Sequence, residues 1–285
     1  MQAKKLEYKG KVLDLSQPRI MGIVNVTPDS FSDGGQYNRL DLAFERVKQL
    51  VLSGASIIDV GGESTRPGAD EVSEQEELDR VIPLIEKISN ELDVWISVDT
   101  CKAAVMKAAL DAGAHIINDI KALTADHAVD VVAKYNCPVC LMHMKGQPKN
   151  MQDDPHYDDL IGDISSFLFE RIDTCLNAGI SRDRIIIDPG FGFGKTLDQN
   201  YKLLGQLDRF LSFGLPLLVG MSRKSMIGNL INANVDERVI GSVAAHLYAV
   251  QKGANILRVH DVKEMSEALK VYLYANQYSK TKKLF

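Results

Sequence analysis

Residues 20–35 read IMGIVNVTPDSFSDGG, an apolar run followed by a largely polar loop. An apolar strand that ends in amide, hydroxyl and carboxylate side chains is suited to present reactive groups at its end. Pro28 fixes one backbone angle, and the pair Gly34-Gly35 frees the angles that follow. The loop can therefore fold over a bound molecule while Asn25 stays anchored at the end of the strand. Taken alone, the segment fits a surface turn rich in Asp and Ser equally well.

The same pattern recurs along the chain, because short apolar runs repeatedly stop at a polar residue before a loop. Seven further runs of this kind span residues 56–60, 94–98, 115–117, 138–142, 184–187, 215–220 and 254–259. Enough chain separates each run from the next to hold a helix and a turn. We therefore predict eight buried strands that alternate with helices.

The intervening segments carry the periodicity of amphipathic helices. We predict helices over residues 42–53, 73–90, 102–112 and 241–252. Ser73, three residues before Glu76, is typical of a capping sequence at a helix start. Alternating strands and helices indicate a parallel sheet, and eight of them in a chain of this length predict an α/β fold, a single-domain (β/α)8 TIM barrel. In that fold the active site lies at the C-terminal ends of the strands.

Composition and charge limit the class of protein. A chain of 285 residues with 45% hydrophobic residues can bury one large core, so we predict one domain over residues 1–285. Residues 1–14 are expected to form an N-terminal extension, and residues 278–285 a tail that frays. The net charge of −5 argues against a nucleic-acid surface. No run is apolar enough to span a membrane and residues 1–13 are too charged for a secretion signal, so we expect a cytoplasmic protein without a membrane partner.

Two motifs suggest other chemistry but do not fit it. Cys137 and Cys140 have the spacing of a redox or metal pair, yet they open a buried strand, where neither thiolate would be activated. Cys101 and Cys175, placed in helical segments, offer no second pair, so we expect structural thiols. Residues 190–196 read GFGFGKT, which lacks one residue of a phosphate-binding loop, so we reject a nucleotide site there.

Five segments of the sequence resemble the motifs of bacterial dihydropteroate synthases. They are residues 25–35, 61–68, 188–195, 222–225 and 258–262, in the same order over essentially the whole chain. The resemblance implies condensation of 4-aminobenzoate with 6-hydroxymethyl-7,8-dihydropterin diphosphate, which releases diphosphate and gives 7,8-dihydropteroate for folate synthesis. It also implies that sulfonamides compete at the aminobenzoate site, that Mg²⁺ is a cofactor, and that the protein is a homodimer.

A dihydropterin ring presents a row of hydrogen-bond donors and acceptors along one edge. Asp99, Asn118, Asp188 and Lys224 supply complementary groups from four strand ends and match the pterin-binding positions of the family. A buried carboxylate beside guanidine-like N–H groups makes charge-assisted hydrogen bonds. The alternative for either aspartate is that it caps the helix that follows.

The diphosphate needs cations and hydrogen-bond donors around it. Arg66, Arg258 and His260 can supply them, with a hydroxyl from Thr65, whereas ordinary surface ion pairs remain the alternative for both arginines. The resemblance assigns Asn25 to the Mg²⁺ ion, although a single amide oxygen is a weak metal signal by itself. The substrate-binding residues that we predict are Thr65, Pro67, Asp99, Asn118, Met142, Asp188, Phe193, Gly220, Ser222, Lys224, Arg258, Val259 and His260.

The expected mechanism is a dissociative displacement, in which diphosphate leaves first and the arylamine attacks second. The electron-rich dihydropterin can carry the positive charge, and the neutral amine needs no strong base. We predict Asp33, Arg66 and Lys224 as catalytic residues, with Asp33 stabilising the cation. The loops 29–37 and 64–69 are expected to close over the reacting centre and exclude water.

Three other functions fit parts of the pattern. A corrinoid-type methyltransferase would share the pterin contacts but has no use for the arginines and the metal amide around a diphosphate. A phosphate-binding barrel isomerase would want a glutamate base and a glycine-rich loop after the late strands. A non-catalytic pterin-binding barrel would have lost part of the motif set, and no motif residue is missing here. Residues 121–129 and 145–159 are the segments that the motifs place least well.

Overall fold

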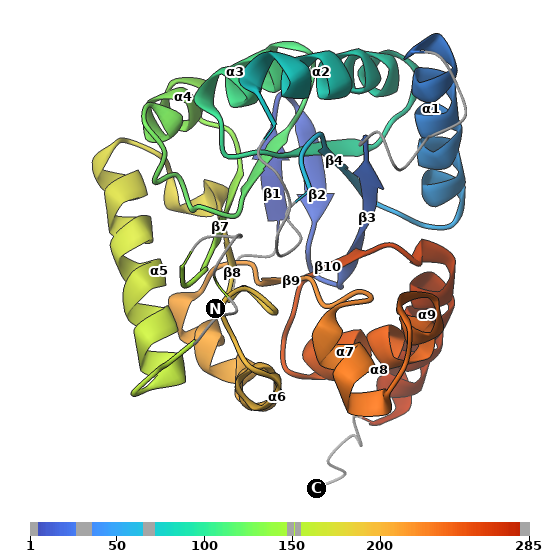
Figure 1. Cartoon of the computed structure of the whole chain (residues 1–285), viewed down its shortest axis with the longest axis vertical. Coiled ribbons are helices and arrows are strands. Elements are labelled where there is room, and N and C mark those ends of the chain that lie inside the picture. The colour runs from blue at the N-terminus through green and yellow to red at the C-terminus, as the bar shows by residue number, and fades with distance from the viewer. Residues whose placement is uncertain (1–4, 27–35, 65–71, 147–150, 152–154, 280–285) are drawn as a thin grey trace, which may run out of the picture.

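The computed structural model describes residues 5–26, 36–64, 72–146, 151 and 155–279, and its parallel strands confirm the predicted (β/α)8 barrel. The wall consists of β3 (Arg19–Asn25), β4 (Ile57–Gly61), β5 (Trp95–Asp99), β6 (Ile116–Asp119), β7 (Val139–Met142), β8 (Ile185–Asp188), β9 (Leu218–Val219) and β10 (Ile256–Val259). Their order, β8-β7-β6-β5-β4-β3-β10-β9, places strands that follow one another in the chain side by side (Figure 1).

The barrel closes between β8 and β9. Ile187 forms a parallel bridge with Leu217, and its N–H donates to the carbonyl of Pro216 at 3.0 Å. Every residue of β4 and β5 is buried, because helices cover one face of each strand and the barrel interior covers the other. This double burial explains why the strands read as continuous apolar runs.

Helices surround the wall in the ring that Figure 1 shows. They are α1 (Gln36–Leu52), α2 (Glu74–Glu91), α3 (Ala103–Asp111), α4 (Ala128–Tyr135), α5 (Leu160–Asn177), α6 (Leu197–Gly205), α7 (Ser225–Ile231), α8 (Val239–Gln251) and α9 (Val262–Ser279), with short 3₁₀ helices η2 (Arg182–Arg184), η3 (Leu207–Phe213) and η4 (Val235–Arg238). The predicted cap of α2 is confirmed, since the Ser73 side chain accepts the N–H of Glu76. Within the described part of the chain, no helix combines the length and the apolarity needed to cross a membrane.

Several elements escaped the sequence analysis. The helices α4, α5, α6, α7 and α9 were not predicted, and α4 begins inside segment 121–129, which the motifs placed poorly. Cys101 was placed in a helix, but it lies in the loop before α3, so that expectation was wrong. Tyr278 and Ser279, the start of the predicted tail, are the last residues of α9, and the rest of the tail lies outside the described residues.

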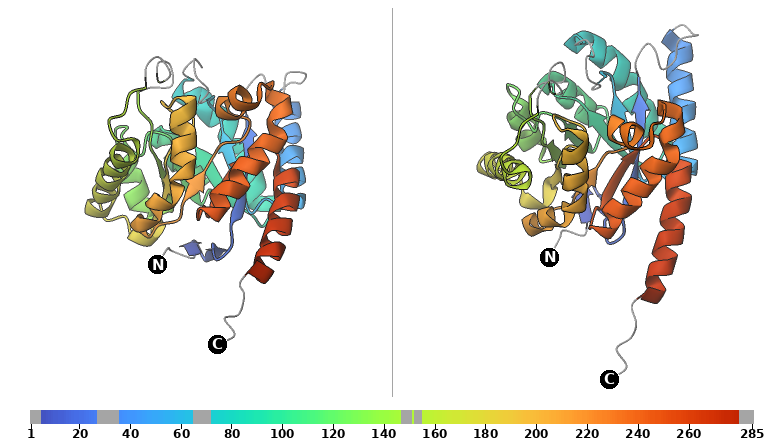
Figure 2. Two further views of the ribbon diagram at one scale, coloured as in Figure 1. Left: turned by 90° about the horizontal axis from the view of Figure 1, so that it is seen from below. Right: turned by 60° about the horizontal axis from the view of Figure 1, so that its bottom comes forward.

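A hairpin covers the end of the barrel at which the wall strands begin (Figure 2). It consists of β1 (Lys5–Tyr8) and β2 (Lys11–Asp14), which pair antiparallel within the predicted N-terminal extension. Leu6 is 1% exposed, whereas Val12 on the hairpin's other face is 59% exposed. The ammonium of Lys11 donates to Asp93 at 2.8 Å, just before β5. The hairpin therefore adds an apolar layer to the core at the end opposite the predicted active site.

The hairpin should contribute measurably to stability. We expect Leu6→Ala to lower the free energy of unfolding by about 2–5 kcal/mol, because it leaves a cavity under the barrel. Val12→Ala on the same hairpin is the matched control and should change it by less than about 0.5 kcal/mol. Urea unfolding followed by circular dichroism measures both. Equal effects of the two substitutions would show that the hairpin does not seal the core.

Candidate active site

The C-terminal strand ends bring several predicted site residues to one rim of the barrel. Gly61 lies opposite Asn25 on one neighbouring strand and opposite Asp99 on the other. Asp99 in turn lies opposite Asn118. A Cβ atom at Gly61 would lie 3.5 Å from the Asn25 amide oxygen and 3.5 Å from the Asp99 Cβ. The glycine therefore leaves open the space between this amide and this carboxylate.

Arg258 connects two carboxylates within this rim. Its Nε donates to Asp59 Oδ2 and its Nη2 to Asp99 Oδ2, both at 2.6 Å. Burial alone would lower the pKa of Arg258, but the two carboxylates outweigh it and raise that pKa. Burial raises the pKa of Asp99 to about 7, although the guanidinium pulls it down. Arg258 is therefore fixed as a cation between two acids, which excludes the surface ion pair considered from sequence.

Asp59 is a site residue that the sequence analysis missed. It lies inside β4, two residues before the strand end, and its side chain is fully buried. Its Oδ2 also accepts a hydrogen bond from the Asn118 amide at 3.1 Å, whereas its Oδ1 has no partner among the described residues. The sequence does carry a signal for it, an acid within the apolar run 57–60, but this acid does not end the run.

Lys224 and Asp188 interact electrostatically at another part of the rim. Burial lowers the pKa of Lys224 to about 8, while Asp188 opposes the shift. Burial raises the pKa of Asp188, and the N–H of Gly190 donates to its Oδ1 at 2.7 Å. This bond gives Asp188 a backbone partner in the turn after β8.

Phe193 belongs to a small apolar cluster beside this turn. The cluster also contains Met142, Ile120 and Met151. The ammonium of Lys224 lies 4.4 Å from the centre of the Phe193 ring, within the range of a cation–π interaction. The predicted contacts Met142 and Phe193 thus form one apolar wall next to the charged groups.

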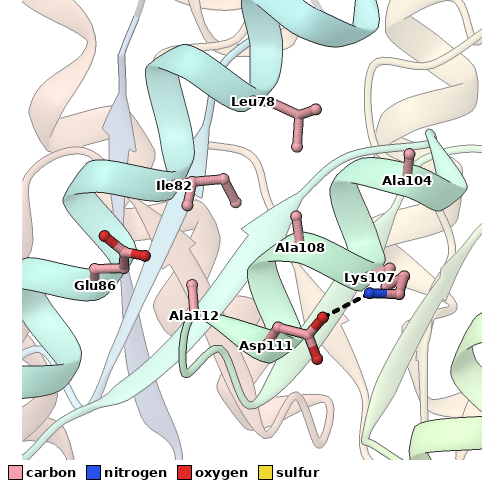
Figure 3. A pocket seen from close by; sticks show the side chains of 8 residues that line it. All are labelled: Leu78, Ile82, Glu86, Ala104, Lys107, Ala108, Asp111 and Ala112. Carbon is pink, nitrogen blue, oxygen red and sulfur yellow. Dashed lines mark hydrogen bonds and ion pairs between the residues drawn. The ribbon is translucent and has the colours of Figure 1, made fainter.

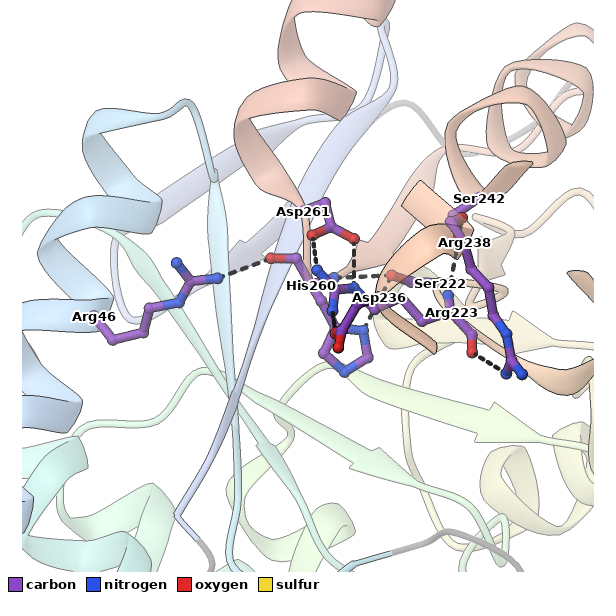
Figure 4. Close-up of polar contacts among 8 residues, drawn as sticks. All are labelled: Arg46, Ser222, Arg223, Asp236, Arg238, Ser242, His260 and Asp261. Carbon is purple, nitrogen blue, oxygen red and sulfur yellow. Dashed lines mark hydrogen bonds and ion pairs between the residues drawn. The ribbon is translucent and has the colours of Figure 1, made fainter. Parts of the chain in front are cut away.

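Ser222 and His260 are joined across the ends of β9 and β10. His260 Nδ1 lies 3.0 Å from the Ser222 hydroxyl, which also accepts the backbone N–H of His260. Arg223 supports this pair, because its Nε and Nη2 donate to both oxygens of Asp261 at 2.9 and 2.6 Å. Arg46 on α1 donates to the His260 carbonyl from the opposite side (Figure 4).

Two small predicted contacts complete this side of the rim. Gly220 follows β9, and a Cβ atom there would lie 3.7 Å from the Arg258 Cβ. Val259 is the last residue of β10 and is buried. Gly220 therefore lies next to Arg258 in space, and Val259 follows Arg258 in the chain.

Four predicted site residues lie outside the described residues. They are Asp33, Thr65, Arg66 and Pro67. The loops 29–37 and 64–69 also fall there for most of their length. The assigned roles of these residues stay predictions.

The residues at the rim are compatible with a magnesium ion only if most ligands come from elsewhere. The amide oxygen of Asn25 can supply one ligand beside the open space at Gly61. Among the described residues, no group of three or more His, Cys, Asp and Glu side chains could hold a metal ion. Mg²⁺ prefers six oxygen ligands and keeps several waters, so phosphate oxygens would have to complete its shell.

The cysteines show no sign of redox or metal chemistry. All four are free, and Cys137 and Cys140 are both buried. Burial raises the pKa of Cys137 to about 12, so its thiol stays protonated at neutral pH. The pair therefore has the features expected of structural thiols.

A groove on the outside of the barrel lies between α2 and α3 (Figure 3). It is lined by Leu78, Ile82, Glu86, Ala104, Lys107, Ala108, Asp111 and Ala112. The ammonium of Lys107 and the carboxylate of Asp111 are exposed and form an ion pair at 2.8 Å. The groove contains none of the predicted site residues, so it is separate from the rim.

Comparison with known proteins assigns the chain to a family. The profile of a family described as pterin binding enzyme matches residues 21–260. Dihydropteroate synthase of Haemophilus influenzae is 54% identical over 268 residues, which cover 94% of this chain and 98% of the relative. The Escherichia coli K12 enzyme is 54% identical over 267 residues, covering 94% of this chain and 95% of the relative. The chain belongs to the dihydropteroate synthase family.

Solved structures of dihydropteroate synthases have the same fold. The Yersinia pestis enzyme in complex with a sulfonamide drug superposes with a TM-score of 0.92 at 55% identity, covering 96% of this chain and 99% of that one. The Xanthomonas albilineans enzyme with 4-aminobenzoic acid gives a TM-score of 0.91 at 48% identity, with the same coverage. The fold of this chain is thus that of dihydropteroate synthases over nearly its whole length.

If Asp99 binds the pterin as predicted, its raised pKa makes pterin binding depend on pH. An ionised carboxylate accepts hydrogen bonds from the ring, so protonation of Asp99 on acidification should weaken binding as the pH falls through about 7. We expect the dissociation constant of 6-hydroxymethyl-7,8-dihydropterin, which carries no titrating phosphate, to rise about tenfold or more between pH 8 and 5.5. Isothermal titration calorimetry measures it.

The variant Asp99→Asn is the control for this pH dependence. It should bind more weakly at pH 8 and should lose the change in affinity near pH 7, because the amide does not titrate. An unchanged pH dependence in Asp99→Asn would assign the titration to another group.

Proposed function

We propose that this chain condenses 4-aminobenzoate with 6-hydroxymethyl-7,8-dihydropterin diphosphate and releases 7,8-dihydropteroate and diphosphate. The single observation that carries the proposal is the family membership, with its high identity over nearly the full chain. The rim supports it, because it brings acids, an amide and cations together at the C-terminal ends of the strands. Sulfonamides should compete with 4-aminobenzoate, as the drug complex of the Yersinia pestis relative suggests.

The pterin ring is best accommodated between the two groups of charges. Asp99, Asn118 and Asp188 offer acceptors and an amide to the amino-pyrimidine edge, and Lys224 offers a donor to the carbonyl. Arg258 holds Asp99 in place at 2.6 Å, so that carboxylate is oriented before the substrate binds. Lys224 stays in reach of the ring because the carbonyl of Phe191 and the face of Phe193 hold its ammonium.

The diphosphate would lie toward Asn25 and His260, on the side of the rim where the loops begin. A bound Mg²⁺ would neutralise part of the diphosphate charge. Asn25 would hold that ion through its amide oxygen, and His260 would donate a hydrogen bond to the anion, oriented by its contact with Ser222. Thr65 and Arg66, outside the described residues, would add donors.

We infer a dissociative displacement. The C–O bond to diphosphate breaks first and leaves a cation on the exocyclic methylene, which the electron-rich dihydropterin stabilises. The amine of 4-aminobenzoate then forms the C–N bond and loses its proton to water or diphosphate, so no strong base is required. Pro67, Phe193, Ser222 and Lys224 would hold the aminobenzoate ring and carboxylate.

The decisive experiment measures diphosphate release from the purified chain. Release should require the pterin diphosphate, Mg²⁺ and 4-aminobenzoate together, and mass spectrometry should identify 7,8-dihydropteroate. A corrinoid-type methyltransferase would instead transfer methyl from a methylated pterin and release no diphosphate. A non-catalytic barrel would bind the pterin without turnover, which would overturn the proposal.

The assigned role of Asp33 gives a separate prediction. If its carboxylate stabilises the cation, Asp33→Ala should lower kcat by about 100-fold, the usual effect of removing one such group. The KM for the pterin diphosphate should change less than about threefold, because the effect is confined to the transition state. Asp41→Ala on the exposed face of α1 is the matched control and should keep normal turnover. Near-normal kcat in Asp33→Ala would remove this residue from the mechanism.

The homodimer also remains part of the proposal. Ile240 on α8 is 84% exposed and Val271 on α9 is 71% exposed, so these helices offer apolar surface for a second copy. Sedimentation velocity at micromolar concentration tests it, and a monomer at every concentration would contradict it.

A further inference from the structure

Lys195 is the residue of the rim whose presence the mechanism leaves unexplained. It follows the glycine-rich turn after β8, and its side chain is 2% exposed. A lysine ammonium is costly to bury and is found inside proteins only when its donors are satisfied. It is also the lysine that gave residues 190–196 their similarity to a phosphate loop, yet it is turned inward.

Three acceptors surround the ammonium of Lys195, one for each of its three donors. They are the carbonyl of Gly190 at 2.8 Å, the carbonyl of Phe193 at 3.1 Å and Nδ1 of His143 at 3.1 Å. Two of them belong to the turn after β8, and the third belongs to the residue after β7. One cation therefore holds both ends of the turn and joins it to the neighbouring strand end.

The backbone of the turn leaves little freedom for another arrangement. Gly190 has a φ of +74°, and a Cβ atom there would lie only 1.8 Å from the His143 carbonyl oxygen. The His143 N–H donates to the Asp188 carbonyl at 2.9 Å. The His143 ring packs edge-on against Phe167, with their centres 5.1 Å apart. The acceptor that His143 presents to Lys195 is thus itself fixed.

Phe193 is the residue through which this network reaches the substrate site. Its carbonyl is bound by Lys195, while its ring lies under the ammonium of Lys224 and against Met142. Losing the Lys195 bond would free the backbone of Phe193 on one side only, since Asn200 still binds the N–H of Gly192 at 2.7 Å. The ring should then shift while the turn as a whole stays folded.

The need to fill space in the core does not by itself account for the lysine. Buried ionic groups can often be replaced by apolar ones of similar volume without loss of stability. Burial lowers the pKa of Lys195 to about 7, and Asp188 opposes that shift, so keeping the cation here costs free energy. An apolar side chain would fill the same space without that cost but could not bind the two carbonyls.

We propose that Lys195 is a positioning residue that sets the place of the Phe193 ring, and thereby the affinity for 4-aminobenzoate and for sulfonamides that compete with it. The inference rests on the proposed function, because it takes the Phe193 ring as one wall of the aminobenzoate pocket. Lys195 acts through Phe193 and does not touch the substrate.

A double-mutant cycle between the two positions tests the inference, with the KM for 4-aminobenzoate as the readout. Lys195→Met keeps the length of the side chain and removes the donors. We expect it to raise this KM about tenfold in the wild-type background, because a displaced ring binds less well. In the Phe193→Ala background the same substitution should raise it by less than about threefold, because the ring it acts on is absent. Lys202→Met, an exposed lysine on α6, is the matched control and should leave the KM unchanged.

The possible results separate this inference from the proposed function. If Phe193→Ala leaves the KM for 4-aminobenzoate unchanged, the assignment of Phe193 to the pocket fails. If Phe193→Ala raises it but Lys195→Met does not, or if Lys195→Met raises it equally in both backgrounds, only the positioning role fails. Should Lys195→Met not fold, His143→Phe takes its place in the cycle, since it removes one acceptor and keeps a ring against Phe167. A coupled rise in KM with that variant supports the inference, and an additive rise overturns it.

Discussion

The guanidinium of Arg258 on β10 donates to Asp59 on β4 and to Asp99 on β5, each at 2.6 Å. The strand β10 is thereby joined at one rim to β4 and β5, which lie far from it in sequence, by two buried carboxylates and a guanidinium whose side chain is 18% exposed. A buried charge without a partner is strongly destabilising, so loss of any one member leaves the others uncompensated. The positions of Asp59 and Asp99 therefore depend on this one arginine and on the closed barrel that brings it to them.

The other half of the rim is arranged around Asp188. Lys224 and Lys195 both donate to backbone carbonyls of the turn that follows this residue, and burial lowers the pKa of both lysines while Asp188 opposes it. Three buried acids, at positions 59, 99 and 188, lie in the same rim as Lys195, which is buried, and as Lys224 and Arg258, which are partly exposed. These six groups balance one another in formal charge. That balance suits an uncharged bicyclic ring, whereas a diphosphate needs the further cations that the loops and a metal ion would add.

A polar residue at the end of a strand is easier to recognise in the sequence than a polar residue inside a strand. Asp99, Asn118 and Asp188 could be predicted as site residues, because each of them ends an apolar run in the sequence. Asp59 could not, because it lies within a run and its role depends on Arg258, which is 199 positions further along the chain. The hairpin β1–β2 and the helix α5 were missed for another reason. Both carry a local pattern, since β1 alternates exposed and buried residues and α5 buries Leu160, Ile164, Leu168 and Ile172 at a spacing of four, but neither element ends at a polar group of the rim.

The sequence by itself determined the alternation of strands and helices, the closed barrel that follows from it, and the set of polar groups at the strand ends. These features depend on short-range patterns of apolar and polar residues, which can be read from each local stretch of the sequence. Only the tertiary structure decided which acid pairs with Arg258, why Lys195 is turned inward, and which atoms remain available to a ligand. Those outcomes depend on distances between strands, and a distance across the barrel is set by packing and closure, which no local stretch of residues encodes.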